Sequence, residues 1–116
     1  MSSPFSEILA SLIRQRGVLG SMVVSESDGI IVDSNLQIGV KGQAVAALTA
    51  SLFRKARLSS RAAGLGEGAF LQLEAENGRV CAAGRDDLVI VTVAESRANV
   101  GLIRVEMLKA LGTLQT

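Results

Sequence analysis

The residue types that most often carry out acid–base and nucleophilic chemistry are scarce in this chain. It has no histidine, which removes the commonest general base, the commonest metal ligand and every Ser–His or Cys–His nucleophile. The only cysteine, Cys81, lies between Val80 and Ala82, and this apolar setting predicts a buried, unreactive thiol. One cysteine also cannot supply the roughly four ligands of a zinc site. The sequence therefore predicts no metal centre.

Carboxylates and a glycine cluster are the remaining candidates for chemistry. Asp86 and Asp87 lie in a predicted turn, where aspartate serves backbone hydrogen bonding, and Glu74 and Glu76 share the solvent-facing side of a predicted strand. The glycines within 64–68 follow a helical pattern and precede a strand, which is the reverse of a dinucleotide-binding turn, and no P-loop lysine follows them. We therefore predict no catalytic residue and no cofactor, and a chain that is not an enzyme.

Composition indicates one globular domain spanning all 116 residues. The chain is 48% apolar but only 3% aromatic, with a net charge of +1. Nucleic-acid binders usually carry a basic excess and aromatic platforms, so we expect no nucleic-acid partner. No apolar run approaches the roughly 18 residues of a membrane span, and the N-terminal region does not resemble a signal peptide. With a single cysteine and hence no intrachain disulfide, these features predict a cytoplasmic protein without direct membrane insertion.

The elements that would position these side chains follow from hydrophobic spacing. Apolar residues at helical spacing between Ser3-Pro4 and Gly17 predict a first amphipathic helix. Residues 18–25 and 30–33 predict two strands joined by a Ser-Asp-Gly turn. Residues 42–65 predict a long helix, which the glycine cluster ends.

Three further strands and a last helix complete the chain. Residues 70–76 alternate, 79–84 return after an Asn-Gly turn, and 88–94 are apolar on both faces, which predicts a central strand. Residues 99–114 predict a helix whose core side would carry Leu102, Val105, Leu108 and Leu111. The fold class is therefore α/β, in three layers, with five strands in a mainly antiparallel sheet. Local pattern does not give the strand order.

The long helix carries two apolar stripes, and only one of them is needed to cover the sheet. Val45, Leu48 and Leu52 form one stripe, whereas the neighbouring stripe contains Ala46, Ala50 and Phe53. Small residues four apart allow another backbone to approach closely. We expect a second copy of the chain to cover the small-residue stripe, because symmetric dimers are the commonest soluble oligomers. The alternative is a wide core face that is covered within one chain.

Charge is segregated along the same helix. No acidic residue lies between Ser34 and Gly66, whereas five basic residues do: Lys41, Arg54, Lys55, Arg57 and Arg61. This basic segment is the candidate partner-binding site, which would dock an acidic protein surface by electrostatic complementarity. For any single one of these residues, a solvated helix face is the simpler interpretation.

The strand at 70–76 is the second candidate for self-association. Its polar side chains would guard a free sheet edge against uncontrolled pairing, or the strand would pair with the same strand of a second copy. Together with the small-residue stripe, it completes the predicted dimer interface, whose strand residues are Phe70, Leu71, Gln72, Leu73 and Glu74.

Three segments resemble the roadblock/LC7 family, over nearly the whole chain. They are residues 20–32 (GSMVVSESDGIIV), 88–93 (LVIVTV) and 99–104 (NVGLIR), in an element order that also matches. The resemblance implies a profilin-like fold with the long helix on one sheet face and the two terminal helices on the other. It also implies a homodimer with a sheet continuous across the two-fold axis and the long helices side by side.

The same resemblance implies a function. Family members bind and regulate Ras-like small GTPases, as in the bacterial and archaeal gliding-motility regulators, and can stimulate GTP hydrolysis by the partner. The family has no invariant catalytic residue to assign here. Two alternatives stay open: a passive adaptor light chain, and a small-molecule sensor of profilin-like or PAS-like architecture.

Overall fold

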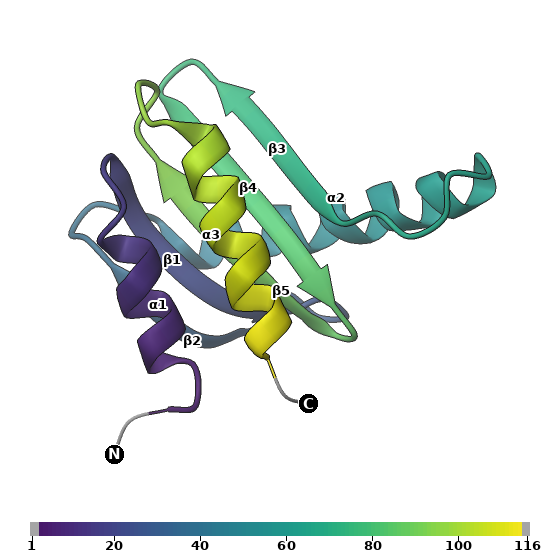
Figure 1. Ribbon diagram of the computed structural model, residues 1–116, viewed down its shortest axis with the longest axis horizontal. Helices are drawn as coiled ribbons and strands as arrows, with labels where there is room; N and C mark the ends of the chain where they lie inside the picture. The colour runs from purple at the N-terminus through teal and green to yellow at the C-terminus, as the bar shows by residue number, and fades with distance from the viewer. Residues whose placement is uncertain (1–2, 115–116) are drawn as a thin grey trace.

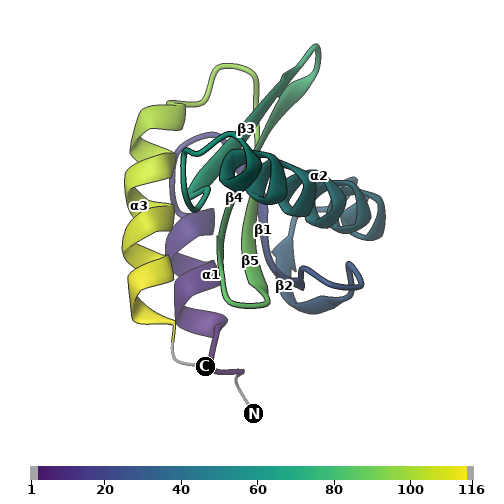
Figure 2. The same cartoon turned by 90° about the vertical axis from the view of Figure 1, so that its right-hand side faces the viewer.

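A computed structural model describes residues 3–114 and has three layers. Figure 2 shows one long helix, α2 (Gly42–Ala62), on one face of a sheet, with α1 (Ser6–Ile13) and α3 (Val100–Thr113) side by side on the other. The three-layer α/β prediction is therefore confirmed. No helix in the described part of the chain is long and apolar enough to cross a membrane.

The sheet contains five strands: β1 (Val18–Ser25), β2 (Ile31–Leu36), β3 (Phe70–Ala75), β4 (Gly78–Arg85) and β5 (Leu88–Ala94). Their spatial order is β2-β1-β5-β4-β3, and every pairing is antiparallel. The run of apolar residues in β5 correctly predicted a central strand, because β5 is covered on both faces. β2 and β3 form the two edges.

Two cores lie on opposite faces of the sheet. Residues that alternate along β5 divide between them: Val89 and Val91 pack under α2, whereas Ile90 and Ala94 pack under α1 and α3. Cys81 belongs to the core under α1 and α3 and is fully buried, as predicted. Its burial raises the pKa of the thiol to about 11, so the thiol stays protonated near neutral pH.

Several predicted boundaries are displaced in the structure. The second strand, predicted at residues 30–33, spans Ile31–Leu36. The long helix ends at Ala62 rather than at residue 65, because Gly64 takes a positive φ of 77° that stops helical hydrogen bonding. The predicted Asn77-Gly78 turn is also wrong by one residue. Ala75 pairs with Gly78 across the hairpin, so the loop is Glu76-Asn77.

The predicted core side of the last helix is confirmed for Leu108 and Leu111, which pack against the core under α1 and α3, and wrong for Leu102 and Val105. Ile103 and Met107 are the residues of α3 that are buried against the sheet, whereas Leu102 and Val105 are exposed. The helix is apolar on several sides, so helical spacing alone allows more than one orientation on the sheet.

Candidate functional site

The small-residue stripe of α2 faces the chain's own sheet. Ala46 and Phe53 are buried in the core under α2, and Ala50 is only 2% exposed. Gly84 on β4 makes room for the aromatic ring, since a Cβ at this position would overlap Phe53. The assignment of Ala46, Ala50 and Phe53 to a dimer interface is therefore corrected: they are core residues that a second copy cannot reach. The alternative, a core face covered within one chain, is the one found.

The other stripe of α2, which we call the α2 flank, is only partly covered, since Val45 packs against the core under α2 and Leu48 does not. It consists of Val45, Leu48 and Leu52, which are half-buried or exposed, and Leu48 is 47% exposed. Both stripes are evident in the sequence, but the small-residue stripe, predicted to meet a second copy, is the one that meets the sheet. Side-chain volume is the signal that distinguishes them, because small residues allow a helix to lie close to a sheet.

An uncovered row of the sheet lies on the same face as α2. Leu73 on β3 pairs with Val80 on β4, which pairs with Val93 on β5, so the three side chains share one face. Val80 packs against the core under α2, which fixes that face as the α2 side. None of the three is fully buried. Figure 2 shows this end of the β3–β4 hairpin extending past α2, so the sheet exposes an apolar row on the α2 side.

β3 lies at the edge of the sheet and pairs only with β4 among residues 3–114. Phe70 packs into the core under α1 and α3, with Arg104 over its ring at 5.5 Å, and Leu71 packs into the core under α2. Gln72 and Glu74 are exposed and linked by a 3.4 Å hydrogen bond from Gln72 Nε2 to Glu74 Oε1. The predicted edge is thus found, but Phe70 and Leu71 belong largely to the chain's own cores.

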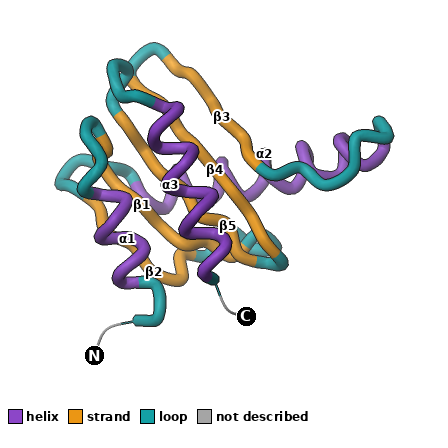
Figure 3. Tube along the Cα trace, in the orientation of Figure 1, coloured by secondary structure: helices purple, strands orange, loops and turns teal. Residues whose placement is uncertain are grey.

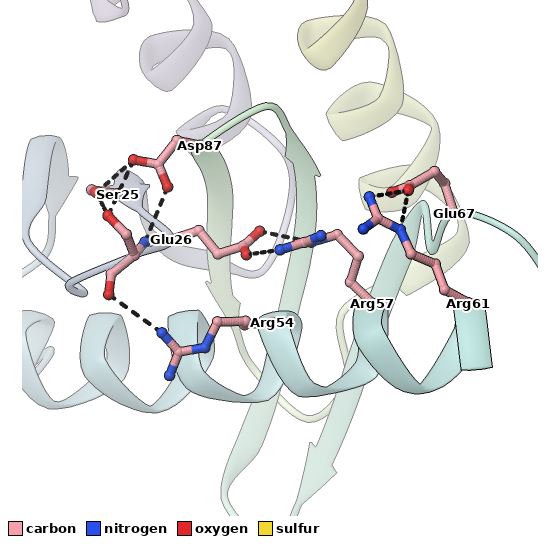
Figure 4. Close-up of polar contacts among 8 residues, drawn as sticks. Ser25, Glu26, Arg54, Arg57, Arg61, Glu67 and Asp87 are labelled. Carbon is pink, nitrogen blue, oxygen red and sulfur yellow. Dashed lines mark hydrogen bonds and ion pairs between the residues drawn. The ribbon is translucent and has the colours of Figure 1, made fainter. Parts of the chain in front are cut away.

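Three of the five predicted partner-binding residues interact within the chain (Figure 4). Arg57 forms a bidentate ion pair with Glu26, Arg61 pairs with Glu67, and Arg54 donates to the backbone carbonyl of Ser27 at 3.3 Å. Of these three arginines, two have a carboxylate partner, so the basic segment is partly neutralised by residues from other elements.

Lys41, Arg54 and Lys55 are exposed and have no carboxylate partner within residues 3–114. They are therefore the predicted basic residues that keep an uncompensated charge.

The Arg57–Glu26 pair joins α2 to the turn between β1 and β2. The Glu26 side chain is only 5% exposed, and the hydrogen bonds that it accepts raise the pKa of Arg57 above its ordinary value. Asp87, from the β4–β5 turn, accepts from the Ser27 backbone N–H at 3.1 Å and from the hydroxyls of Ser25 and Ser27. Two turns and one helix are thereby held together.

The role of Glu26 was not predicted from the sequence. Glu26 shares its turn with a second carboxylate, Asp28, so local sequence does not single it out, and its partner lies 31 residues away. The prediction that Asp87 serves backbone hydrogen bonding is confirmed, although the N–H group belongs to the neighbouring turn.

A long helix over a five-stranded antiparallel sheet, with terminal helices behind it, is the architecture of roadblock-type domains. The family model described as Roadblock/LC7 domain matches residues 4–94. The chain therefore belongs to the Roadblock/LC7 family.

Known proteins with similar sequence or structure support this assignment. An uncharacterised protein of Methanocaldococcus jannaschii is 31% identical over 110 residues, which cover 95% of this chain and 92% of that protein. The Roadblock/LC7 domain from Streptomyces avermitilis superimposes with a TM-score of 0.83 at 16% identity, covering 96% and 94% of the two chains. Myxococcus xanthus MglB gives a TM-score of 0.79 at 20% identity, covering 95% and 93%.

Proposed function

We propose that the chain is a non-catalytic interaction module that forms a homodimer and, as a dimer, binds and regulates a Ras-like small GTPase. The observation that carries the dimer is the partly uncovered apolar surface made by the α2 flank and the row Leu73, Val80 and Val93, in which Leu48 and Leu73 are exposed. This surface adjoins the unpaired edge of β3. Pairing of two β3 strands would extend the sheet, satisfy their free backbone groups and bring a second α2 over the exposed row.

The GTPase role is supported by family membership and by the residual charge on α2. Arg54 and Lys55 are adjacent, exposed and without a carboxylate partner in the described chain. They are the residues that we expect to meet an acidic surface of the GTPase. Arg57 and Arg61 are expected to contribute less, because a partner would first have to displace Glu26 or Glu67.

Analytical ultracentrifugation tests the dimer. We expect the wild type to sediment as a dimer at micromolar concentration and Leu48→Glu and Leu73→Lys to shift it toward monomer, because each places a charge in the apolar surface. Leu102→Glu is the matched control, since Leu102 is an exposed leucine on the opposite side of the sheet. A monomeric wild type would refute the dimer.

Calorimetric titration tests the GTPase role. The titrant is the Ras-like GTPase encoded beside the gene, loaded with GDP or with a non-hydrolysable GTP analogue. We expect binding in at least one nucleotide state and a weaker interaction for Lys55→Glu, with Lys109→Glu on α3 as the control. Absence of binding in both states contradicts the proposal. GTP turnover, measured with and without the chain, then separates a regulator from a passive adaptor.

A further inference from the structure

The outward face of α3 carries two exposed apolar side chains in its N-terminal half, followed by the exposed Lys109. Leu102 is 59% exposed and Val105 is 48% exposed, while Ile103 and Met107 cover the sheet. Residues three apart lie on the same side of a helix, so the two exposed side chains form one patch. Exposed apolar side chains that adjoin one another on a helix are candidates for contact with another protein. This patch lies across the sheet from α2 (Figure 2), away from the proposed dimer surface.

A cavity of about 510 Å³ continues this patch at the N-terminal end of α3. Leu102 and Ile103 form part of its wall, and Arg16 and Arg97 also line it. Its shape depends on two connected loops, one after α1 and one after β5. The backbone N–H of Glu95 donates to the carbonyl of Gly17 at 2.8 Å.

Gly17 keeps these two loops in close contact. It has a φ of 86°, and a Cβ at this position would lie 2.9 Å from the Cβ of Ala98. Any other residue would therefore both strain the backbone and push the loops apart. The loops are thus held at a fixed distance, with Arg16 and Arg97 on them.

Among residues 3–114, the arginines that line the cavity have no carboxylate within ion-pair distance. Arg16 and Arg97 are both exposed. Glu95 is the one acidic residue that lines the cavity. This contrasts with α2, where Arg57 is already paired with a buried carboxylate. An acidic group in the cavity would meet an excess of positive charge.

We propose that the outward face of α3 and this cavity bind an acidic amphipathic segment of another protein. Its apolar side chains would pack on Leu102 and Val105, and its carboxylates would enter the cavity toward Arg16 and Arg97. Exposed apolar area and unpaired cations lie next to each other here, and such a segment satisfies both. The contact is small, so the expected dissociation constant is on the order of 10 µM.

Chemical-shift perturbation on the ¹⁵N-labelled full chain tests this proposal. The probe is a short amphipathic helical peptide with leucines at every third or fourth position and a cluster of glutamates at one end. The control peptide carries lysines in place of the glutamates. We expect the acidic peptide to shift amides at 16–17, 97–103 and 105, and the basic peptide to bind at least tenfold more weakly. Equal binding of the two peptides, or shifts confined to α2, would overturn the proposal.

Two variants test which residues contribute to binding of the acidic peptide. Leu102→Ser and Arg97→Gln should each weaken the acidic peptide about three- to tenfold, because each removes one contact at a solvent-accessible site. The matched controls Leu58→Ser and Lys55→Gln change exposed residues of α2 and should leave the affinity unchanged. Equal losses in all four variants would contradict the assigned surface.

Two further measurements separate this surface from the alternatives. Vesicles rich in phosphatidylserine test for a membrane surface: tighter binding to these vesicles than to the peptide would replace the proposal. Sedimentation of Leu102→Ser tests independence from the dimer. We expect its self-association to match the wild type, so failure of the peptide proposal and failure of the dimer proposal give different results.

Discussion

Two stripes run along α2, and they differ in side-chain volume more than in polarity. The inner stripe contains Ala46, Ala50 and Phe53 and lies in the core, whereas the α2 flank remains at the surface. The two alanines allow the helix to lie close to the sheet, and Phe53 is accommodated because Gly84 has no side chain beneath its ring. In α2 the helix backbone approaches the sheet at the two alanines, and the aliphatic side chains of the α2 flank stay partly at the surface.

The same contrast separates the charges of α2. Arg57 lies on the side that meets the sheet and pairs with buried Glu26, whereas Lys55 points away from it and has no carboxylate partner in the described chain. A charge near the core must be paired to offset its desolvation, and a surface charge need not be. On the inner side of α2 the apolar side chains are buried and Arg57 is paired with Glu26. On its outer side apolar side chains are exposed, and Lys55 has no carboxylate partner among residues 3–114.

Introducing a glutamate into each of the two stripes should give the largest difference between them in the free energy of unfolding. Ala50→Glu places a carboxylate in the core and should lower the free energy of unfolding by more than about 4 kcal/mol or prevent folding. Leu48→Glu, on the α2 flank, should change the free energy of unfolding of the monomer by less than about 1 kcal/mol. Urea denaturation of dilute protein, followed by circular dichroism, measures both. Similar losses in the two variants would show that the stripes do not differ.

Shortening the side chains of the neighbouring residues Phe53 and Leu52 should give the next largest difference in the free energy of unfolding. Phe53→Ala leaves a cavity in the core under α2 and should cost about 3–5 kcal/mol of the free energy of unfolding. Leu52→Ala removes a partly exposed side chain and should cost about 1 kcal/mol when the protein is monomeric. Guanidinium denaturation at one fixed protein concentration compares them. A cost for Leu52→Ala as large as that for Phe53→Ala would contradict the assigned orientation of α2.

The spacing of apolar residues predicted the positions of the strands well. It did not predict which side of α2 meets the sheet, and it predicted that side of α3 only in part. A strand has two faces, so alternation together with the turn residues fixes which side chains share a face, and β1 and β5 were predicted to the residue. A helix has no such binary choice. In α2 and in α3 two apolar stripes compete, and the one that meets the sheet depends on volumes and strand positions that local pattern does not contain.

For a related reason, only part of the candidate site could be predicted from the sequence. The edge position of β3 and the uncompensated charge of Lys55 could be inferred from neighbouring residues. The neutralisation of Arg57 by Glu26 could not, because the two residues are brought together only when α2 crosses the turn between β1 and β2. A run of like charges in a sequence is thus no measure of the charge that a surface presents.

The two arginine–glutamate pairs of α2 offer a smaller test of the same contrast. Glu26→Gln leaves Arg57 beside a neutral group at a buried position, and we expect the Tm to fall by about 5 °C. Glu67→Gln removes the partner of Arg61 at an exposed site, where ion pairs contribute little, and the Tm should change by about 1 °C. Differential scanning calorimetry measures both. Equal changes would mean that burial of Glu26 does not set the strength of its pair.

The smallest expected effect is a pH dependence of the free energy of unfolding, which arises from the buried thiol of Cys81 in the core under α1 and α3. Its pKa is raised from 9.0 to about 11 by burial, so the folded protein holds the thiol proton more tightly than the unfolded chain does. Below about pH 9 both states are protonated and the stabilisation is complete; as the pH rises from about 9 to 11 it is lost, by at most about 1.4 kcal/mol per pH unit. Cys81→Ala lacks this proton, so the difference in free energy of unfolding between wild type and variant should decline over that window. Denaturation curves at several pH values measure it, and a constant difference would indicate that the thiol reaches water in the folded state.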